Sequence, residues 1–210
     1  MNEQNDVFAS LKPFLTRLKS DAPTPGGGAV AGLLGALAAA LSHMVASLTV
    51  DKKKYAEHRQ TFQEAMPKME TAIESFYGLM LADVEVFDQY MAALKLPKST
   101  DSEKTIRKTA MRNAAKEAAR VPMESLILAN EILPLVQLAA DFGNKNAISD
   151  AGMAAILVNA AARSAALNVR INLSSMPEED AAPRRAQLEG LLASTLGHAT
   201  AIEDSVANAL

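Results

Sequence analysis

Residues 21–29, DAPTPGGGA, combine two prolines with three consecutive glycines directly before a long apolar stretch. Gly26, Gly27 and Gly28 carry no Cβ, so a ligand can approach their backbone closely. A helix beginning here would also offer unpaired N–H groups to an anionic or carbonyl oxygen. A tight turn between packed helices is the alternative, but a turn seldom needs three glycines, and we favour a binding role. A phosphate loop is excluded, because the Gly-Lys-Ser/Thr ending is absent.

Acidic side chains suited to general acid or base chemistry lie in two segments. Asp83 and Asp88 belong to LADVEVFDQYM, where helical spacing places them on different faces. Asp150 belongs to GNKNAISDAG, near Asn144, at a predicted helix start. Carboxylates on a surface helix are ordinary, and capping alone would explain Asp150. Residue type therefore does not single out one catalytic group.

Cationic side chains that could hold an anion also lie in two places. Lys52, Lys53 and Lys54 follow the apolar stretch in a run, and such a run is most often a solvated helix start. Arg163 and Arg170 lie seven residues apart on an otherwise apolar helix, on roughly one face. If these arginines are buried, they need anionic partners, either an internal carboxylate or that of a ligand.

The elements that must position these residues are predicted to be helices. Helix-forming residues dominate, aromatic residues make up only 4% of the chain, and period-two alternation is hard to find. We expect one all-α domain over residues 1–210, a bundle with two buried Ala/Gly-rich central helices and long proline-kinked helices. The expected helices are 7–18, kinked at Pro13 or with its second part starting there, 26–50, 52–95 with break or kink points at Pro67 and Gly78, 101–142 bent by Pro122 and Pro134, 150–173, and about 183–210.

The apolar stretch before Asp51 is long enough to suggest a membrane span. Its apolar character comes mostly from Ala and Gly, and it contains Ser42 and His43. We therefore favour a central helix buried on all sides, and no membrane association. Two Ala/Gly-rich helices permit very close packing, against each other or across the seam of a homodimer.

Composition excludes several classes of protein. The formal net charge of −3 gives no general attraction for nucleic acid. The absence of cysteine excludes disulfides and thiolate metal sites, and His43, His58 and His198 show no metal-type spacing. The first residues, MNEQNDVFASLKPF, do not read as a secretory signal. We expect a cytoplasmic protein without a structural metal.

Several motifs occur together in order: TPGGGA, LTVDKKKY, DVEVFDQYMAALKLP, TDSEKTIR, GNKNAISDAG and AALNVRINL. This series resembles the folate cyclodeaminase/cyclohydrolase family, which includes the C-terminal domain of formiminotransferase-cyclodeaminases and stand-alone methenyltetrahydrofolate cyclohydrolases. The resemblance implies an all-helical dimer that handles 5,10-methenyltetrahydrofolate at the glycine turn. The family often has Ser after the glycines, where this chain has Ala29, so no hydroxyl is available there.

The resemblance favours a cyclohydrolase, because no segment resembles a formiminotransferase domain. A formiminotetrahydrofolate cyclodeaminase is the alternative enzyme, and a non-catalytic helical scaffold is the alternative of another class. A folate derivative is then the substrate, with no prosthetic group. The implied carboxylates are Asp88, Asp83 and Asp150, in that order. The implied binding residues are Lys52, Lys53, Lys54, Arg163 and Arg170 for the glutamate tail, and Gly26, Gly27, Gly28, Asn144 and Asn168 for the pteridine.

Overall fold

The computed structural model describes residues 3–210, and their regular structure is entirely helical, which confirms the expected all-α class. Two short 3₁₀ helices, η1 (Lys53–His58) and η2 (Lys145–Ala147), interrupt the series of α-helices. The α-helices are α1 (Glu3–Leu18), α2 (Gly27–Val50), α3 (Arg59–Leu94), α4 (Asp101–Glu131), α5 (Leu133–Phe142), α6 (Ile148–Leu173) and α7 (Glu178–Ala209).

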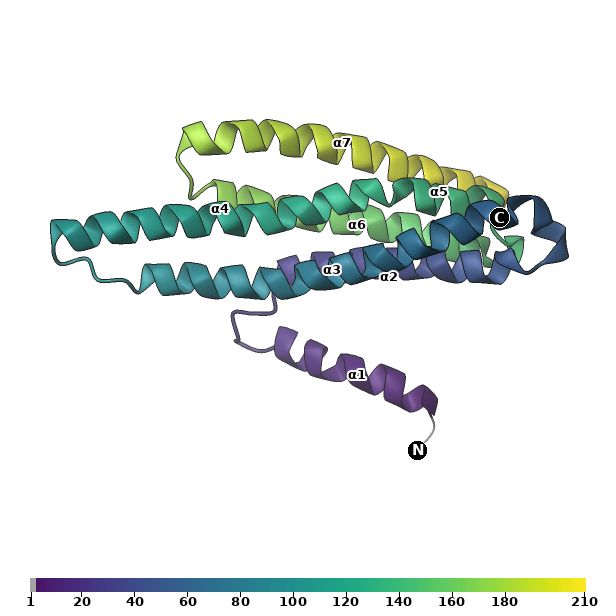
Figure 1. Ribbon diagram of the computed structural model, residues 1–210, viewed down its shortest axis with the longest axis horizontal. Helices are drawn as coiled ribbons and strands as arrows, with labels where there is room; N and C mark the ends of the chain where they lie inside the picture. The colour runs from purple at the N-terminus through teal and green to yellow at the C-terminus, as the bar shows by residue number, and fades with distance from the viewer. Residues whose placement is uncertain (1–2) are drawn as a thin grey trace.

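The bundle is built around α2 and α6, which pack against each other (Figure 1). On the outside, α3 covers α2, while α4 and α7 cover α6. Small residues allow this close approach: a Cβ at Gly35 of α2 would overlap the ring of Phe76 on α3. Phe76 itself is fully buried in the core. Close-packed interiors of this kind leave little freedom for side chains at the helix ends to reposition.

The expectation that the first Ala/Gly-rich helix, α2, is buried on all sides is wrong, and the second, α6, also exposes part of its surface. Each buries most of its small residues and exposes several larger apolar ones, because a helix packed on two or three sides still has a free face. The exposed side chains are Leu37, Met44 and Leu48 on α2, and Met153, Ile156, Leu167 and Ile171 on α6.

Three helical stretches are long and apolar enough to cross a membrane by length and composition. They are Gly27–Val50, Asp101–Phe142 and Lys145–Leu173, and the buried share of their apolar windows is 50%, 44% and 50%. About half of the residues in these apolar windows are therefore buried inside the bundle.

Pro67 and Pro122 lie inside helices, whereas Pro134 lies at the start of one. Helix α3 runs unbroken through Pro67 and Gly78, and α4 runs through Pro122. The single bent helix expected over 101–142 is instead two helices, because Pro134 lies in the first turn of α5, where its missing N–H costs no intrahelical bond. The last helix begins at Glu178 rather than near Pro183, with three acidic residues in its first turn.

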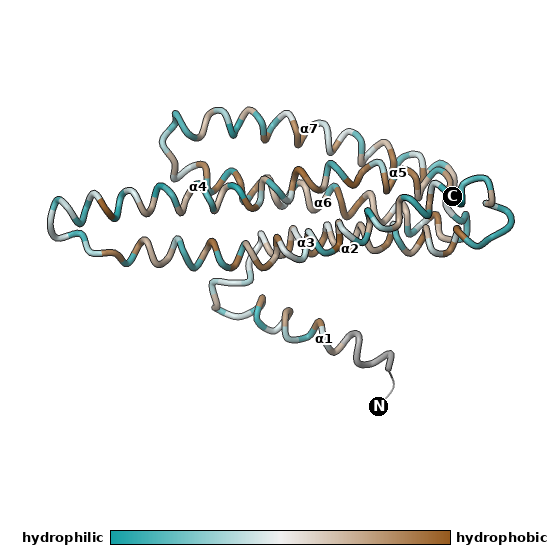
Figure 2. The backbone as a smooth tube through the Cα atoms, viewed as in Figure 1, coloured by the Kyte–Doolittle hydropathy of each residue, from teal (hydrophilic) through white to brown (hydrophobic). Residues whose placement is uncertain are grey.

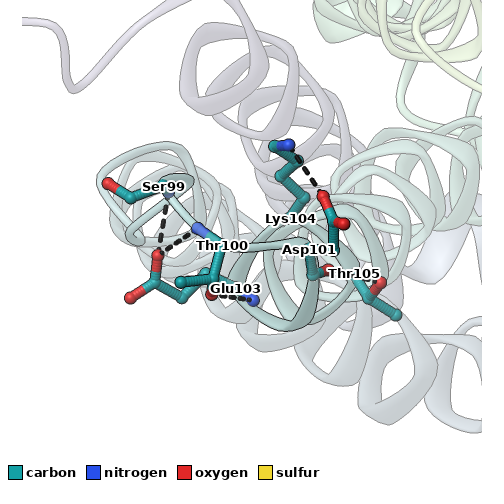
Figure 3. A network of polar contacts seen from close by, with 6 residues as sticks. All are labelled: Ser99, Thr100, Asp101, Glu103, Lys104 and Thr105. Atoms are coloured by element: carbon teal, nitrogen blue, oxygen red, sulfur yellow. Dashed lines mark hydrogen bonds and ion pairs between the residues drawn. The ribbon is translucent and has the colours of Figure 1, made fainter.

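The turn between α3 and α4 is fixed by a capping box. The Thr100 hydroxyl accepts a bond from the Glu103 N–H, and the Glu103 carboxylate accepts bonds from the N–H groups of Ser99 and Thr100 (Figure 3). These backbone bonds hold the pKa of Glu103 below its ordinary value. The sequence motif thus defines where α4 begins.

Helix α1 projects away from the bundle (Figure 1). The Arg17 guanidinium donates to the carbonyl oxygen of Thr24 at 2.9 Å, which ties the end of α1 to the glycine turn. Leu11 and Leu15 of α1 are exposed.

Candidate functional site

The glycine turn forms the N-terminus of α2, with Gly26 as the N-cap residue. The Ala29 N–H donates to the Asp83 carboxylate of α3, so this carboxylate lies directly over the first turn of α2. A Cβ at Gly28 would overlap that carboxylate, so the contact requires glycine. Within residues 3–210 the N–H groups of Gly27 and Gly28 have no hydrogen-bond partner. Gly27 is exposed, so its N–H remains available to a ligand oxygen, whereas Gly28 is buried against the Asp83 carboxylate.

Burial of Asp83 between α2 and α3 raises the pKa of its carboxyl group, and the bond from Ala29 N–H opposes this rise in part. A carboxyl with a raised pKa gains and loses a proton more readily near neutral pH than an exposed aspartate does. Asp83 therefore has the character of a general acid or base, held beside free N–H donors.

Asn168 completes the cluster from α6. A Cβ at Gly27 would lie 3.4 Å from its Nδ2 atom, so the amide faces the exposed turn. Nδ2 donates to the Ser164 carbonyl at 2.8 Å, which fixes the orientation of the amide. The structure thus brings together Gly27, Gly28, Asp83 and Asn168, from three helices.

Asp88 and Asp150 lie elsewhere. Asp88 is exposed, five residues beyond Asp83 and thus on another face of α3, and no hydrogen bond or ion pair involves it in the described chain. Asp150 lies in the first turn of α6. Helix α6 begins beside the C-terminal end of α2 and reaches the glycine turn only at Asn168, so Asp150 lies at the opposite end of the bundle.

The lysine run also lies at the opposite end. Lys52, Lys53 and Lys54 follow the C-terminus of α2, and Figure 2 shows this segment as a hydrophilic loop at the end of the bundle opposite to the α3–α4 turn. Asn144 lies there too, where its side chain donates to the Leu48 carbonyl at 3.1 Å. Helix α2 is 24 residues long, or roughly 35 Å. In one chain, these residues cannot contact the same small molecule as Gly28.

The two arginines of α6 are exposed rather than buried, and both have partners within the chain. Arg163 donates to the Asn159 side chain at 2.7 Å, and Arg170 makes a salt bridge of 2.9 Å with Glu189 of α7. Arg170 therefore pairs with an internal carboxylate, which is one of the two alternatives that the sequence left open for this arginine. Among the described residues, no group of three His, Asp or Glu is placed to hold a metal ion.

Sequence reasoning missed a cleft of about 760 Å³ beside the α3–α4 turn. Helices α3 and α4 continue past the start of α2, which leaves this end of the bundle open (Figure 1). Lys104, Arg107, Lys108 and Arg112 line the cleft from α4, with Tyr90 opposite them on α3. The spacing of these cations by three and four residues could have indicated the cleft, because such spacing places them along one side of a helix.

Known proteins are similar to this chain in sequence and in fold. The profile of the formiminotransferase-cyclodeaminase family matches residues 10–188. A methenyltetrahydrofolate cyclohydrolase of Methylorubrum extorquens is 42% identical over 185 residues, covering 88% of this chain and 89% of that protein. A formimidoyltransferase-cyclodeaminase of Rattus norvegicus is 31% identical over 84% of this chain, which spans only 33% of that longer protein.

The crystal structure of a formiminotetrahydrofolate cyclodeaminase from Thermotoga maritima superimposes with a TM-score of 0.78. Sequence identity to it is 33%, and the match covers 93% of this chain and 92% of that chain. The family profile, the sequence identity and the structural similarity each extend over most of the chain. All three indicate the same family. This chain belongs to the formiminotransferase-cyclodeaminase family.

Proposed function

We propose that this protein is a folate one-carbon enzyme that hydrolyses 5,10-methenyltetrahydrofolate to 10-formyltetrahydrofolate. The observation that carries this proposal is the Asp83 carboxyl group, held against Gly28 with a raised pKa beside the free N–H groups of the turn. The substrate has a cationic bridging carbon between N5 and N10. A carboxylate beside that carbon stabilises its charge and accepts a proton from attacking water.

The reaction balances with Asp83 as the proton carrier. The water oxygen bonds to the bridging carbon, and Asp83 takes one proton from it. The bond from carbon to N5 then breaks, its electron pair stays on N5, and Asp83 returns the proton there. The remaining hydroxyl proton is released to solvent as the carbon becomes a formyl group. We place the amide-like edge of the pteridine against the Gly27 N–H group and the Asn168 side chain.

Release of ammonia from formiminotetrahydrofolate is the second candidate, and the similarity to the Thermotoga maritima cyclodeaminase favours it. In that reaction N10 attacks the formimino carbon and gives up its proton, which Asp83 is placed to pass to the imino nitrogen. That nitrogen takes a second proton from solvent, its bond to carbon breaks with the electron pair staying on nitrogen, and it leaves as ammonia. The relative named as a cyclohydrolase matches more of its own length than the bifunctional relatives do, at higher identity. This difference favours hydrolysis.

One assay separates the candidates. The purified chain is incubated with methenyltetrahydrofolate, and loss of the near-ultraviolet absorbance of the bridged ring is followed above the spontaneous rate. A parallel incubation with formiminotetrahydrofolate measures released ammonia. Hydrolysis in the first assay alone supports the proposal, and ammonia release in the second alone supports the cyclodeaminase. If neither reaction is accelerated, the chain is a scaffold and the enzymatic proposal is abandoned.

We further propose that the protein is a homodimer in solution, with the exposed faces of α2 or α6 at the seam. Leu48 and Leu167 are 43% and 65% exposed, and large apolar side chains of this kind commonly mark interfaces. Light scattering at micromolar concentration should give twice the chain mass of 22.3 kDa. The Leu167→Glu variant should shift this towards the monomer, because a buried unpaired carboxylate opposes association.

A matched control for the dimer is Ile106→Glu, since Ile106 is 60% exposed but lies on α4. This variant should keep the wild-type mass. A monomeric wild type, or a protein that remains with membranes until detergent is added, would contradict the proposed dimer.

A further inference from the structure

The cleft between the α3–α4 turn and the α6–α7 turn carries a surplus of positive charge. Lys104 pairs with Asp101 at 2.8 Å, and Arg112 pairs with Asp180 and Glu179 of α7. Lys98 and Lys108, which also line the cleft, have no hydrogen bond or ion pair anywhere in the described residues. Two of the cations at this rim are therefore free to bind an anion.

Arg107 adds a third uncompensated charge. Its Nε and Nη2 atoms donate to the carbonyl oxygen of Leu94, at 3.3 and 3.1 Å. This acceptor is neutral, so the guanidinium charge is not balanced. The bonds orient the guanidinium at the mouth of the cleft, where an arginine can hold a carboxylate in a bidentate manner.

The wall of the cleft is apolar, whereas its rim is basic. Tyr90, Met111 and Ala115 line it from α3 and α4, and Ala115 is fully buried. A ligand that fits this arrangement has a flat apolar body and an anionic end. A free inorganic anion would use the cations and leave the apolar wall unused.

The distance from the Asp83 site fits such a ligand. Tyr90 follows Asp83 by seven residues, which is two turns of α3 on the same face, or about 10 Å. On the other side of the cleft, Ser175 follows Asn168 by seven residues and lies in the turn after α6, which ends at Leu173. Asn172 lies between them and donates to the Ala118 carbonyl at 2.6 Å, which fixes this wall to α4.

The capping box sets the positions of Lys98 and Lys108 at the rim of the cleft. The Glu103 carboxylate binds the Ser99 and Thr100 N–H groups, so the loop that carries Lys98 is held next to the first turn of α4 (Figure 3). Lys108 follows two turns later on the same helix. The two free ammonium groups therefore belong to a rigid part of the fold rather than to a loose tail.

We propose that this cleft binds the p-aminobenzoyl-glutamate part of the substrate. The benzoyl ring would pack on Tyr90 and Met111, and the glutamate carboxylates would pair with Lys98, Arg107 and Lys108. The inference rests on the proposed function, because it takes a folate as the ligand at Asp83. It assigns the tail to a different set of cations from Lys52, Lys53 and Lys54.

The test compares ligands with and without the tail. Binding of tetrahydrofolate and of tetrahydropteroate, which lacks the glutamate, is measured by calorimetry for the wild type and for Lys98→Gln/Lys108→Gln. The wild type should bind tetrahydrofolate at least about tenfold more tightly, since charge-assisted hydrogen bonds contribute on this scale. The double variant should lose most of this preference. Its KM for methenyltetrahydrofolate should rise by a similar factor with little change in kcat.

Two further variants make the result specific. Lys68→Gln removes an exposed, unpaired lysine of α3 outside the cleft and should keep the wild-type preference. Lys53→Gln tests the lysine run. The proposal is overturned if the double variant keeps the preference, if Lys53→Gln abolishes it, or if the wild type shows none. If the preference depends on Lys98 and Lys108 but neither folate reaction is accelerated, the cleft assignment stands and the proposed function fails.

Discussion

Replacing Asp83 by Asn is expected to lower kcat/KM for methenyltetrahydrofolate by about 100-fold or more, because the variant keeps the shape of the side chain and loses its charge and its proton transfer. The amide oxygen can still accept the Ala29 N–H, so the local fold should persist. Steady-state rates followed by absorbance measure the effect.

Asp88→Asn is the matched control for this prediction. Asp88 is on the same helix, but it is exposed and has no partner in the described part of the chain. Its variant should retain activity within a few-fold of the wild type. A nearly inactive Asp88→Asn beside an active Asp83→Asn would move the catalytic role to Asp88. Full activity of both variants would exclude either carboxylate as the catalytic group.

The raised pKa of Asp83 also predicts how the stability of this variant depends on pH. Because burial disfavours the ionised form, the folded wild type is penalised once Asp83 loses its proton. The contribution of Asp83 to stability is complete below the ordinary aspartate pKa of about 3.9 and is lost as pH rises through its folded value. Asp83→Asn should therefore be at least as stable as the wild type at pH 7.

Thermal or urea unfolding across this pH range measures the comparison. The advantage of Asp83→Asn should shrink as pH falls towards 4. An Asp83→Asn protein that is clearly less stable at pH 7 would show that the carboxylate stabilises the fold. That result would weaken its assignment as a group held for chemistry.

Gly28→Ala is expected to be the most damaging single-carbon change in the turn. The added Cβ would overlap the Asp83 carboxylate, so either α3 or the carboxylate must move. A displacement of about 1 Å at a reacting group can reduce a rate 100-fold, and we expect a loss of kcat/KM of that order. Rates and the melting temperature, measured together, separate a misplaced carboxylate from a damaged fold.

Gly26→Ala provides the matched control, because a Cβ at Gly26 meets no atom closer than 3.8 Å and the backbone there is extended. Its activity should stay within a few-fold of the wild type. If Gly28→Ala were as active as Gly26→Ala, the close approach of Asp83 to the turn would have no catalytic importance.

The helical class and several helix ends could be predicted from the sequence, because they depend on local interactions. The Thr100–Glu103 capping box occurs where the sequence motif places it, whereas Pro134 lies in the first turn of a separate helix, α5, instead of bending one long helix. Other local signals were overridden by packing. Pro67 lies on the exposed side of α3, where water can satisfy the carbonyl that lost its partner, so the helix continues through it.

Residue types and helical spacing predict the helices, the glycine turn and a short set of candidate carboxylates, because these are local properties of the sequence. It could not choose between Asp83 and Asp88, because that choice depends on which face of α3 packs against α2. It could not place Lys52, Lys53 and Lys54 relative to Gly28, because their separation follows from the length and direction of α2. The basic cleft likewise exists only where α3 and α4 extend past α2, which tertiary packing alone decides.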